Sequence, residues 1–321
     1  MHSGMKRRDF LLGSLGAFGL AGCARPPAIR RRSLVSIVRA PEYSQEVYGT
    51  MRRVLAEHKL QVRGRRVVLK PNLVEFEPAS TINTNPILVH AALEAFRSLG
   101  AEVVIAEGPG HRRGTLDLAD AAGYFRVIPD FENIFTDLNL DEVSRVRLPH
   151  PVSRLDSLYL PHTVLACDLL VSMPKMKTHH WVGATLSMKN LFGVVPGGVY
   201  GWPKNVLHWA GISESIVDLH SLFPRPFAIV DGIVGMDGNG PIQGRPKPVG
   251  VIVSGHDPVA VDATCCRIME IEPSRIDYLT LAGGLDRLEA KNIQQIGEKL
   301  EGVATPFDLI LELRSLRRVS A

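Results

Sequence analysis

The segment from Leu169 to Gly193 reads LLVSMPKMKTHHWVGATLSMKNLFG. Its first five residues form an apolar run that predicts a buried strand, and Pro174 ends that strand. Three lysines, two histidines and an asparagine follow. Lysine ordinarily stands on solvated surfaces. Lysines gathered beyond the carboxyl end of a buried strand lie where an open α/β sheet keeps its ligand crevice. The segment therefore predicts an α/β sheet with a pocket for an anion.

Apolar strands alternate with amphipathic helices on both sides of this segment. This alternation predicts a mostly parallel open sheet with helices on both faces. We expect one domain over residues 34–314, with a possible small inserted lobe at residues 131–161. The predicted strands are Leu34–Val38, Arg66–Lys70, Glu102–Ala106, Leu169–Met173, Phe227–Val230, Val249–Ser254 and an edge strand Phe307–Leu313. The predicted helices are Ser44–His58, Pro86–Leu99, Thr115–Ala122, Leu186–Val194, Val206–Leu222 and Pro258–Met269.

The composition is that of a globular protein of 321 residues, with 45% hydrophobic and 22% charged residues. A chain of this length buries a substantial core. The formal net charge is +4, and no basic stripe with interleaved aromatic residues is present. We therefore expect no nucleic acid among its partners.

The N-terminus carries two processing signals. Residues 6–12, KRRDFLL, match a twin-arginine export signal, which the export machinery reads and which is not part of the fold. Residues 20–23, LAGC, resemble a bacterial lipobox, whose cysteine is lipidated. We expect residues 1–22 to be a signal peptide, Cys23 to be the lipidation site and residues 23–33 to be a tether. The protein would then be an exported, membrane-anchored lipoprotein facing the periplasm or the cell exterior. The alternative is an ordinary signal peptide with a chance cysteine.

The other cysteines show no metal-binding spacing. Cys167 lies in an apolar run, and Cys265 and Cys266 are adjacent in a helical pattern, so no C-x-x-C pair exists. We therefore expect no iron–sulfur cluster and no structural zinc. Twin-arginine export often accompanies a cofactor inserted before export, and the nature of any cofactor stays open.

Polar residues follow the carboxyl ends of five predicted strands, which is the edge where open α/β sheets bind ligands. Lysine neutralises phosphate or carboxylate, and asparagine orients a carbonyl or hydroxyl group. On this basis the predicted substrate-binding residues are Lys70, Asn72, Lys175 and Asn190. The predicted catalytic residues are His179, Lys177 and Lys189, with His179 as the general acid or base because its ordinary pKa lies near neutrality.

Three aspartates offer hard oxygen ligands for a divalent metal: Asp231, Asp257 and Asp262. Two alternatives stay open. A buried lysine between these carboxylates would make a salt-bridge scaffold without metal, and Asp257 has the position of a helix N-cap.

The motifs, in this order, resemble the bacterial and archaeal family catalogued as domain of unknown function 362. They are VVLKPN at 67–72, TNP at 84–86, AEGPG at 106–110, MPKMKTH at 173–179, SMKNLFG at 187–193, VDGI at 230–233, GPIQG at 240–244 and HDPVAVD at 256–262. Many relatives are described as iron–sulfur proteins because they carry an added ferredoxin-like segment. This sequence has no such segment.

Two functions fit these observations. The first is an enzyme acting on a small anionic molecule, with possible assistance from a metal. The second is a non-catalytic periplasmic protein that binds an anionic solute or cofactor. An electron-transfer protein is disfavoured by the cysteine pattern.

Overall fold

The predicted strand after residue 168 forms β7 (Leu169–Met173), and it lies inside a larger sheet. The computed structural model describes residues 32–111, 114–224 and 226–318. The predicted signal peptide, Cys23 and most of the predicted tether lie outside these residues. Within the described ranges, no helix has both the length and the apolar character needed to cross a membrane.

The strands of the main sheet follow the order β12-β1-β11-β10-β7-β2-β3-β4. β11 runs antiparallel to both of its neighbours, and the other neighbours in this order are parallel. Beyond β7, strand β8 pairs with the long β10 and with β9. The bounds are β1 (Ser33–Arg39), β2 (Arg66–Pro71), β3 (Glu102–Glu107), β4 (Phe135–Asp137), β8 (Lys175–His179), β9 (Gly183–Thr185), β10 (Phe227–Asn239), β11 (Gln243–Gly255) and β12 (Ile293–Gly297).

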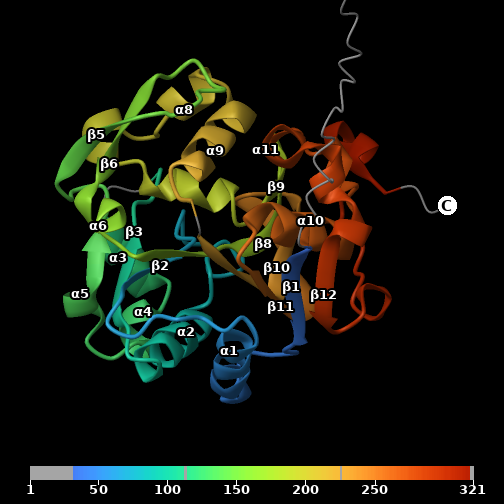
Figure 1. Ribbon diagram of the computed structural model, residues 1–321, viewed down its shortest axis with the longest axis horizontal. Coiled ribbons are helices and arrows are strands. Elements are labelled where there is room, and N and C mark those ends of the chain that lie inside the picture. The colour runs from blue at the N-terminus through green and yellow to red at the C-terminus, as the bar shows by residue number, and fades with distance from the viewer. Residues whose placement is uncertain (1–31, 112–113, 225, 319–321) are drawn as a thin grey trace, which may run out of the picture. The chain divides into compact units, whose positions relative to one another are not determined.

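Helices cover both faces of this sheet because successive side chains of a strand point to opposite faces. In β2, Val67 and Leu69 belong to one hydrophobic core, and Val68 belongs to the other. The first core includes residues of α1, α2 and α4, and the second includes residues of α9, α10 and α11. Figure 1 shows the two groups of helices on opposite sides of the sheet. The predicted α/β fold with a mostly parallel sheet is confirmed.

The helices have the following bounds: α1 (Glu46–Glu57), α2 (Pro86–Ser98), α3 (Thr115–Ala121), α4 (Tyr124–Val127), α5 (Phe131–Ile134), α6 (His162–Leu165), α7 (Gly197–Tyr200), α8 (Val206–Trp209), α9 (Ile212–Ser221), α10 (Pro258–Ile268) and α11 (Asp277–Leu288). Short 3₁₀ helices are η1 (Lys189–Val194), η2 (Pro273–Arg275), η3 (Ala290–Asn292), η4 (Leu300–Gly302) and η5 (Leu311–Leu316).

The segment considered as an inserted lobe contributes to two sheets. Within it, β4 pairs with β3 of the main sheet. The strands β5 (Val143–Arg147) and β6 (Ser157–Pro161) form a separate antiparallel pair. Leu158 and Leu160 of β6 nevertheless belong to the second core of the main domain.

A crevice opens between the carboxyl ends of β2 and β7. From β2 the chain passes through α2 on the face of the first core. From β7 it continues through β8, β9 and η1 to α9, and η1 and α9 belong to the second core. Since the chain leaves these two neighbouring strands toward opposite faces, this is the position where open α/β sheets bind ligands.

Several elements differ from the sequence prediction. Lys175 and Lys177 lie in a further strand, β8, which was not among the predicted strands. The helix expected over 206–222 divides into α8 and α9 at Gly211, whose φ of +107° is unsuited to a helix. The edge strands of the sheet are β12 and β4, and the expected strand at 307–313 overlaps the 3₁₀ helix η5.

Candidate functional site

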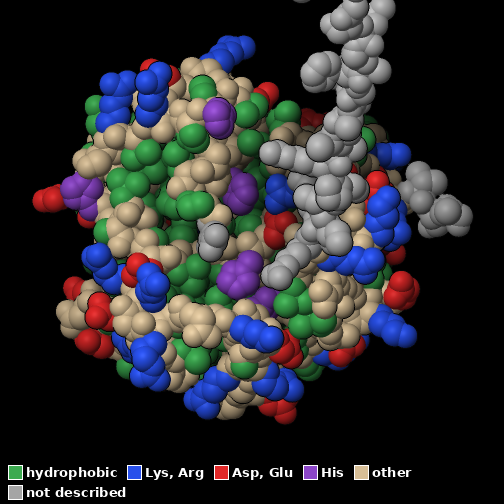
Figure 2. Space-filling model, in the orientation of Figure 1, with side chains coloured by type: hydrophobic (Ala, Val, Ile, Leu, Met, Phe, Trp, Pro, Cys, Tyr) green, Lys and Arg blue, Asp and Glu red, His purple; other side chains and the backbone are tan. Residues whose placement is uncertain are grey.

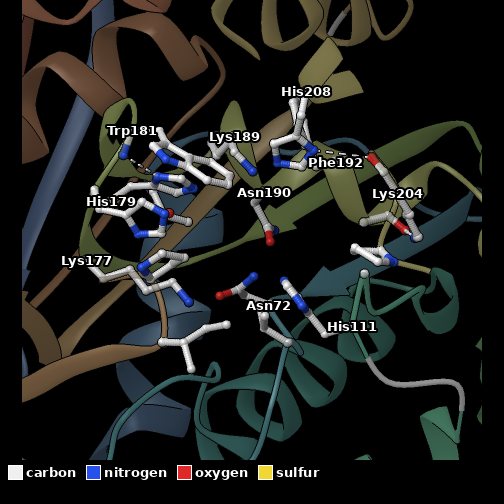
Figure 3. Close-up of a pocket in the computed structure, with 18 of the residues that line it drawn as sticks. Asn72, His111, Lys177, His179, Trp181, Lys189, Asn190, Phe192, Lys204 and His208 are labelled. Carbon is white, nitrogen blue, oxygen red and sulfur yellow. Dashed lines mark hydrogen bonds between the residues drawn. The ribbon is translucent and has the colours of Figure 1, made fainter. Parts of the chain in front are cut away.

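A cavity of about 880 Å³ occupies the predicted crevice. Its wall comes from the ends of β2 and β3, from β8, from η1 and from the loop before α8. Figure 3 shows Lys177 and Lys204 on opposite sides of the cavity, with Lys189 and Asn72 between them. Of the seven residues predicted as catalytic or substrate-binding, the structure brings six together here: Lys70, Asn72, Lys177, His179, Lys189 and Asn190.

Lys70 forms a buried structural pair in the cavity wall. Its Nζ donates to Glu107 Oε2 at 2.7 Å, to the Pro71 carbonyl at 3.1 Å and to Asn190 Oδ1 at 3.2 Å. A lysine ammonium has three hydrogens, so this one has none left for a ligand. The Asn190 amide in turn donates to the Lys70 carbonyl and to Ser172 Oγ, both at 3.1 Å. Both residues therefore fix the geometry of the wall.

Gly193 allows η1 to lie directly against this pair. A Cβ atom at residue 193 would stand 1.9 Å from Glu107 Oε1 and 2.5 Å from Lys70 Nζ. Such distances are far below van der Waals contact, so any side chain would force the buried pair apart. The requirement explains why the motif SMKNLFG ends in glycine.

Three other lysines face the cavity without a carboxylate partner among the described residues. Lys177 Nζ donates only to the Ile82 carbonyl, at 2.9 Å, and Lys204 Nζ donates to the carbonyls of Gly108 and Gly193. Lys189 Nζ lies 3.7 Å from the centre of the Phe192 ring. Burial is the main cause that lowers the pKa of each amine, to about 7 for Lys189 and Lys204 and well below the ordinary value for Lys177.

Two buried acceptor atoms in the same wall have no hydrogen-bond partner among the described residues. They are Asn72 Oδ1 and Thr185 Oγ1, on side chains that are more than nine-tenths buried. Thr185 stands opposite Lys177 in the pairing of β8 with β9. An unpaired buried polar atom is costly unless a ligand or water satisfies it. The wall therefore offers hydrogen-bonding groups beside the amines.

One ring nitrogen of His179 accepts a hydrogen bond in this structure, which fixes the tautomer of the neutral ring. The backbone N–H of Trp181 donates to His179 Nδ1 at 3.2 Å. The proton of the neutral ring therefore lies on Nε2. Burial, and next the charge of Lys189, lower the pKa of His179 well below its ordinary value. A ring held in this state has an Nε2–H that can donate a hydrogen bond, and its lowered pKa makes it a weak proton acceptor.

Two further histidines have the opposite tautomer. His180 Nδ1 donates to the Gly240 carbonyl at 2.8 Å, and His208 Nδ1 donates to the Lys204 carbonyl at 3.3 Å. Their Nε2 atoms therefore carry free lone pairs. Trp181 stacks edge-on against both rings and is 63% exposed. Figure 2 shows histidine side chains near the middle of one face, with most lysines and arginines around its rim.

Lys175 lies outside the cavity, contrary to the prediction that it binds substrate. Its Nζ donates to Asp231 at 2.7 Å and to the Tyr43 hydroxyl at 2.9 Å, and both charged side chains are buried. Asp231 also accepts from the Tyr43 hydroxyl and from the backbone N–H of Asn85. This is the salt-bridge scaffold that the sequence left open as an alternative.

The predicted metal site is not assembled, because each of its aspartates has partners of its own. Asp257 caps the N-terminus of α10 and accepts from Ser33 and Arg287. Asp262 accepts from the backbone N–H groups of Ser187 and Met188 at 2.8 and 3.0 Å, which fixes the turn before Lys189. Within the described residues, no group of three or more metal-ligating side chains is present. The prediction of Asp231, Asp257 and Asp262 as one metal site is therefore wrong.

The structure adds residues that the sequence analysis did not select. Lys204 and His208 line the cavity, together with Thr185, His180, Trp181 and His111. One signal would have identified Lys204: it is the sole charged residue between Lys189 and Glu214. An isolated lysine in an apolar, glycine-rich stretch that follows the functional strand is a candidate for the same pocket.

The fold and the site define an α/β protein with a lysine- and histidine-lined cavity at the switch point of its sheet. The family model described as "Domain of unknown function (DUF362)" matches residues 67–267, which include β2, β7, β8 and η1. The chain belongs to this family.

The chain is also similar to two individual proteins. The chain is 29% identical over 224 residues to the thylakoid-associated protein sll1697 of Synechocystis sp. (strain ATCC 27184 / PCC 6803 / Kazusa), a match that covers 66% of this chain and 65% of that protein. Among solved structures, the lactate racemase apoprotein from Thermoanaerobacterium thermosaccharolyticum is similar, with a TM-score of 0.45 and 14% identity. That match covers 75% of this chain and 58% of the racemase chain.

Proposed function

We propose that the protein is an enzyme that binds a small organic anion in the cavity and acts on it. The observation that carries this proposal is a set of three inward-facing amines, Lys177, Lys189 and Lys204, none of which forms an ion pair with a carboxylate of the described residues. The lining carboxylate Glu107 is already paired with Lys70. An unpaired charge in a buried site costs several kcal/mol. A carboxylate or phosphate of the ligand would supply the missing counter-charge.

The neutral groups of the wall would orient the rest of the ligand. His179 Nε2–H donates to a ligand oxygen, and Asn72 Oδ1 accepts from a hydroxyl or amide group. Proton acceptors are also present, because His180 and His208 carry free Nε2 lone pairs. A bound molecule with an ionised group and a reactive neutral group would therefore meet donors and acceptors in one cavity.

A binding protein without catalysis is the second candidate, and the tautomer of His179 favours it. A ring that only donates a hydrogen bond can hold a ligand without transferring a proton. The two candidates differ in what happens to the bound molecule. Mass spectrometry of the ligand before and after incubation with the protein separates them, because an enzyme changes the ligand and a binding protein returns it intact.

Anion binding is expected to weaken as the pH rises. Lys189 and Lys204 have a pKa of about 7 in the empty cavity, mainly because burial disfavours their charged form. A bound anion raises both pKa values, so binding takes up protons. Affinity is therefore highest below about pH 7 and falls above it, by at most about tenfold per pH unit for each lysine.

Isothermal titration calorimetry with inorganic phosphate and with pyruvate, between about pH 6 and about pH 9, measures this dependence. Repeating the titration in buffers of different ionisation enthalpy counts the protons taken up. Exposed Lys299 gives a matched control, since Lys299→Met leaves the cavity unchanged. Affinity without pH dependence, or no binding of either anion, would contradict the proposal.

We also propose that the protein works outside the cytoplasm as an anchored lipoprotein. Residues 6–12 and the lipobox ending at Cys23 support this proposal. Cys23→Ala is expected to move the protein from the membrane fraction to the soluble fraction, because the lipid attachment site is removed. Fractionation of cells followed by immunoblotting measures the effect. Equal membrane association of the variant and the unchanged protein would count against the anchor.

A further inference from the structure

The four lysines that line the cavity in the described part of the chain differ in how their amines are held. Lys70 Nζ has three acceptors, one of them a carboxylate. Lys177 and Lys204 donate to backbone carbonyls. No described acceptor holds Lys189 Nζ, which lies over the Phe192 ring and points toward the open part of the cavity (Figure 3). The lone pair of a neutral Lys189 amine would therefore be free to react.

We propose that Lys189 is a nucleophile that forms an imine with the carbonyl carbon of an anionic aldehyde or ketone. This inference rests on the proposed function, because it names the substrate class of the same cavity. Lys177 and Lys204 bind the carboxylate or phosphate of the substrate, and Lys189 reacts with its carbonyl group. An unreactive clamp would need only charge, whereas an amine without hydrogen-bond partners is arranged for attack.

Because of its surroundings, the Lys189 amine is uncharged in a fraction of the molecules near neutral pH. Burial, and next the charge of Lys70, lower the pKa of Lys189 to about 7. The face of the Phe192 ring attracts the ammonium form, and this effect is smaller than that of burial. Amines in apolar pockets beside another cation are the pattern used by imine-forming enzymes. Near neutral pH, part of the Lys189 amine is therefore in the neutral form that can attack a carbonyl carbon.

The reaction balances without an oxidant or a reductant. The Nζ lone pair of Lys189 attacks the carbonyl carbon, and the carbonyl oxygen takes the proton that the nitrogen loses, which gives a carbinolamine. The nitrogen lone pair then expels this oxygen as water, with a second proton supplied by a neighbouring ammonium group or by solvent. The products are a protonated imine and one water molecule. The Nε2–H of His179 donates a hydrogen bond to the oxygen while its charge develops.

Reductive trapping tests the proposal. The full-length protein is incubated near pH 7 with pyruvate, or with pyridoxal 5′-phosphate, in the presence of sodium cyanoborohydride, and the adducts are located by peptide mass mapping. These probes share a carbonyl group, and they carry a carboxylate and a phosphate respectively. We expect modification of Lys189 to be at least about tenfold faster than that of Lys177, Lys204 or exposed Lys299. Excess inorganic phosphate is expected to slow it, because phosphate occupies the anion site.

Lys189→Arg separates reaction from binding, because arginine keeps the charge and cannot form the imine. This variant is expected to lose the trapped adduct in the cavity, and its affinity for inorganic phosphate is measured beside that of the unchanged protein. Lys299→Met is expected to keep both. Phosphate binding without trapping at Lys189, or trapping spread evenly over surface lysines, would overturn the nucleophile and leave the proposed function standing. Failure of the unchanged protein to bind any of these anions would overturn the proposed function itself.

Discussion

Lys175→Met is expected to lower the free energy of unfolding by about 3–5 kcal/mol, whereas Lys177→Met is expected to raise it by about 0.5–2 kcal/mol. The two lysines lie two residues apart in β8, and both are fully buried. The same substitution in the same strand therefore gives opposite signs. Urea denaturation of the ligand-free variants near neutral pH measures both values.

The sign follows from what each substitution leaves behind. Without Lys175, the buried carboxylate of Asp231 loses the ammonium group that lies 2.7 Å away and keeps neutral donors such as the Tyr43 hydroxyl. A buried charge without a counter-charge is strongly destabilising. Without Lys177, only the Ile82 carbonyl loses a donor, and a desolvated amine is replaced by an apolar side chain of similar length.

An exposed ion pair gives the control for the buried pair of Lys175 and Asp231. Asp308 contacts Arg245 at 2.5 Å, and both side chains are about two-thirds exposed or more. Asp308→Asn is expected to change the free energy of unfolding by less than about 1 kcal/mol, because water screens exposed ion pairs. If Lys175→Met and Lys177→Met destabilised the protein equally, Lys177 would be a structural residue. The proposal that Lys177 binds an anion in the cavity would then lose its main support.

The double substitution Lys177→Met/Lys204→Met is expected to weaken the binding of phosphate or pyruvate by about a hundredfold to about ten-thousandfold. A hydrogen bond to a charged group contributes about 1.5–3 kcal/mol, and each substitution removes one such donor from the cavity. The ligand-free variant is expected to unfold at the same urea concentration as the unchanged protein or at a higher one. Calorimetric titration and urea denaturation on the same samples measure the two effects.

Loss of binding together with retained stability identifies a ligand site, because a structural lysine would lower both. Lys299→Met is the control for the loss of one positive charge from the whole molecule. Unchanged affinity in the double variant would show that the anion binds elsewhere.

The fold was largely predictable because its strands are buried on both faces. Runs such as Leu169–Met173 are apolar throughout, and their alternation with helices determines the class of sheet. The edge strand β12, with sequence IQQIG, has no continuous apolar run and was missed for that reason. Strand β8 was missed because its sequence, KMKTH, has no apolar run and follows a proline that ends the preceding strand.

The position of the candidate site could be predicted from the sequence, but the roles of its individual side chains could not. Strand-end residues such as Asn72 and Lys189 do meet in one cavity. The different roles of Lys175 and Lys177 depend on a carboxylate 56 residues away along the chain and on the Tyr43 hydroxyl, 132 residues away. Local spacing contains no information about such partners. The tautomer of His179 likewise depends on the backbone N–H of Trp181.

The side chains of β8 alternate between two environments, and this alternation limits insertions and deletions within the strand. Lys175, Lys177 and His179 share one side of the strand, and Met176 on the other side belongs to the second hydrophobic core. Inserting or deleting one residue within β8 would exchange the two sides, so that ammonium groups would enter the apolar core and a thioether would enter the cavity. Natural homologues are therefore expected to tolerate conservative replacements in this strand while keeping its length constant, and indels should gather in the connecting loops instead.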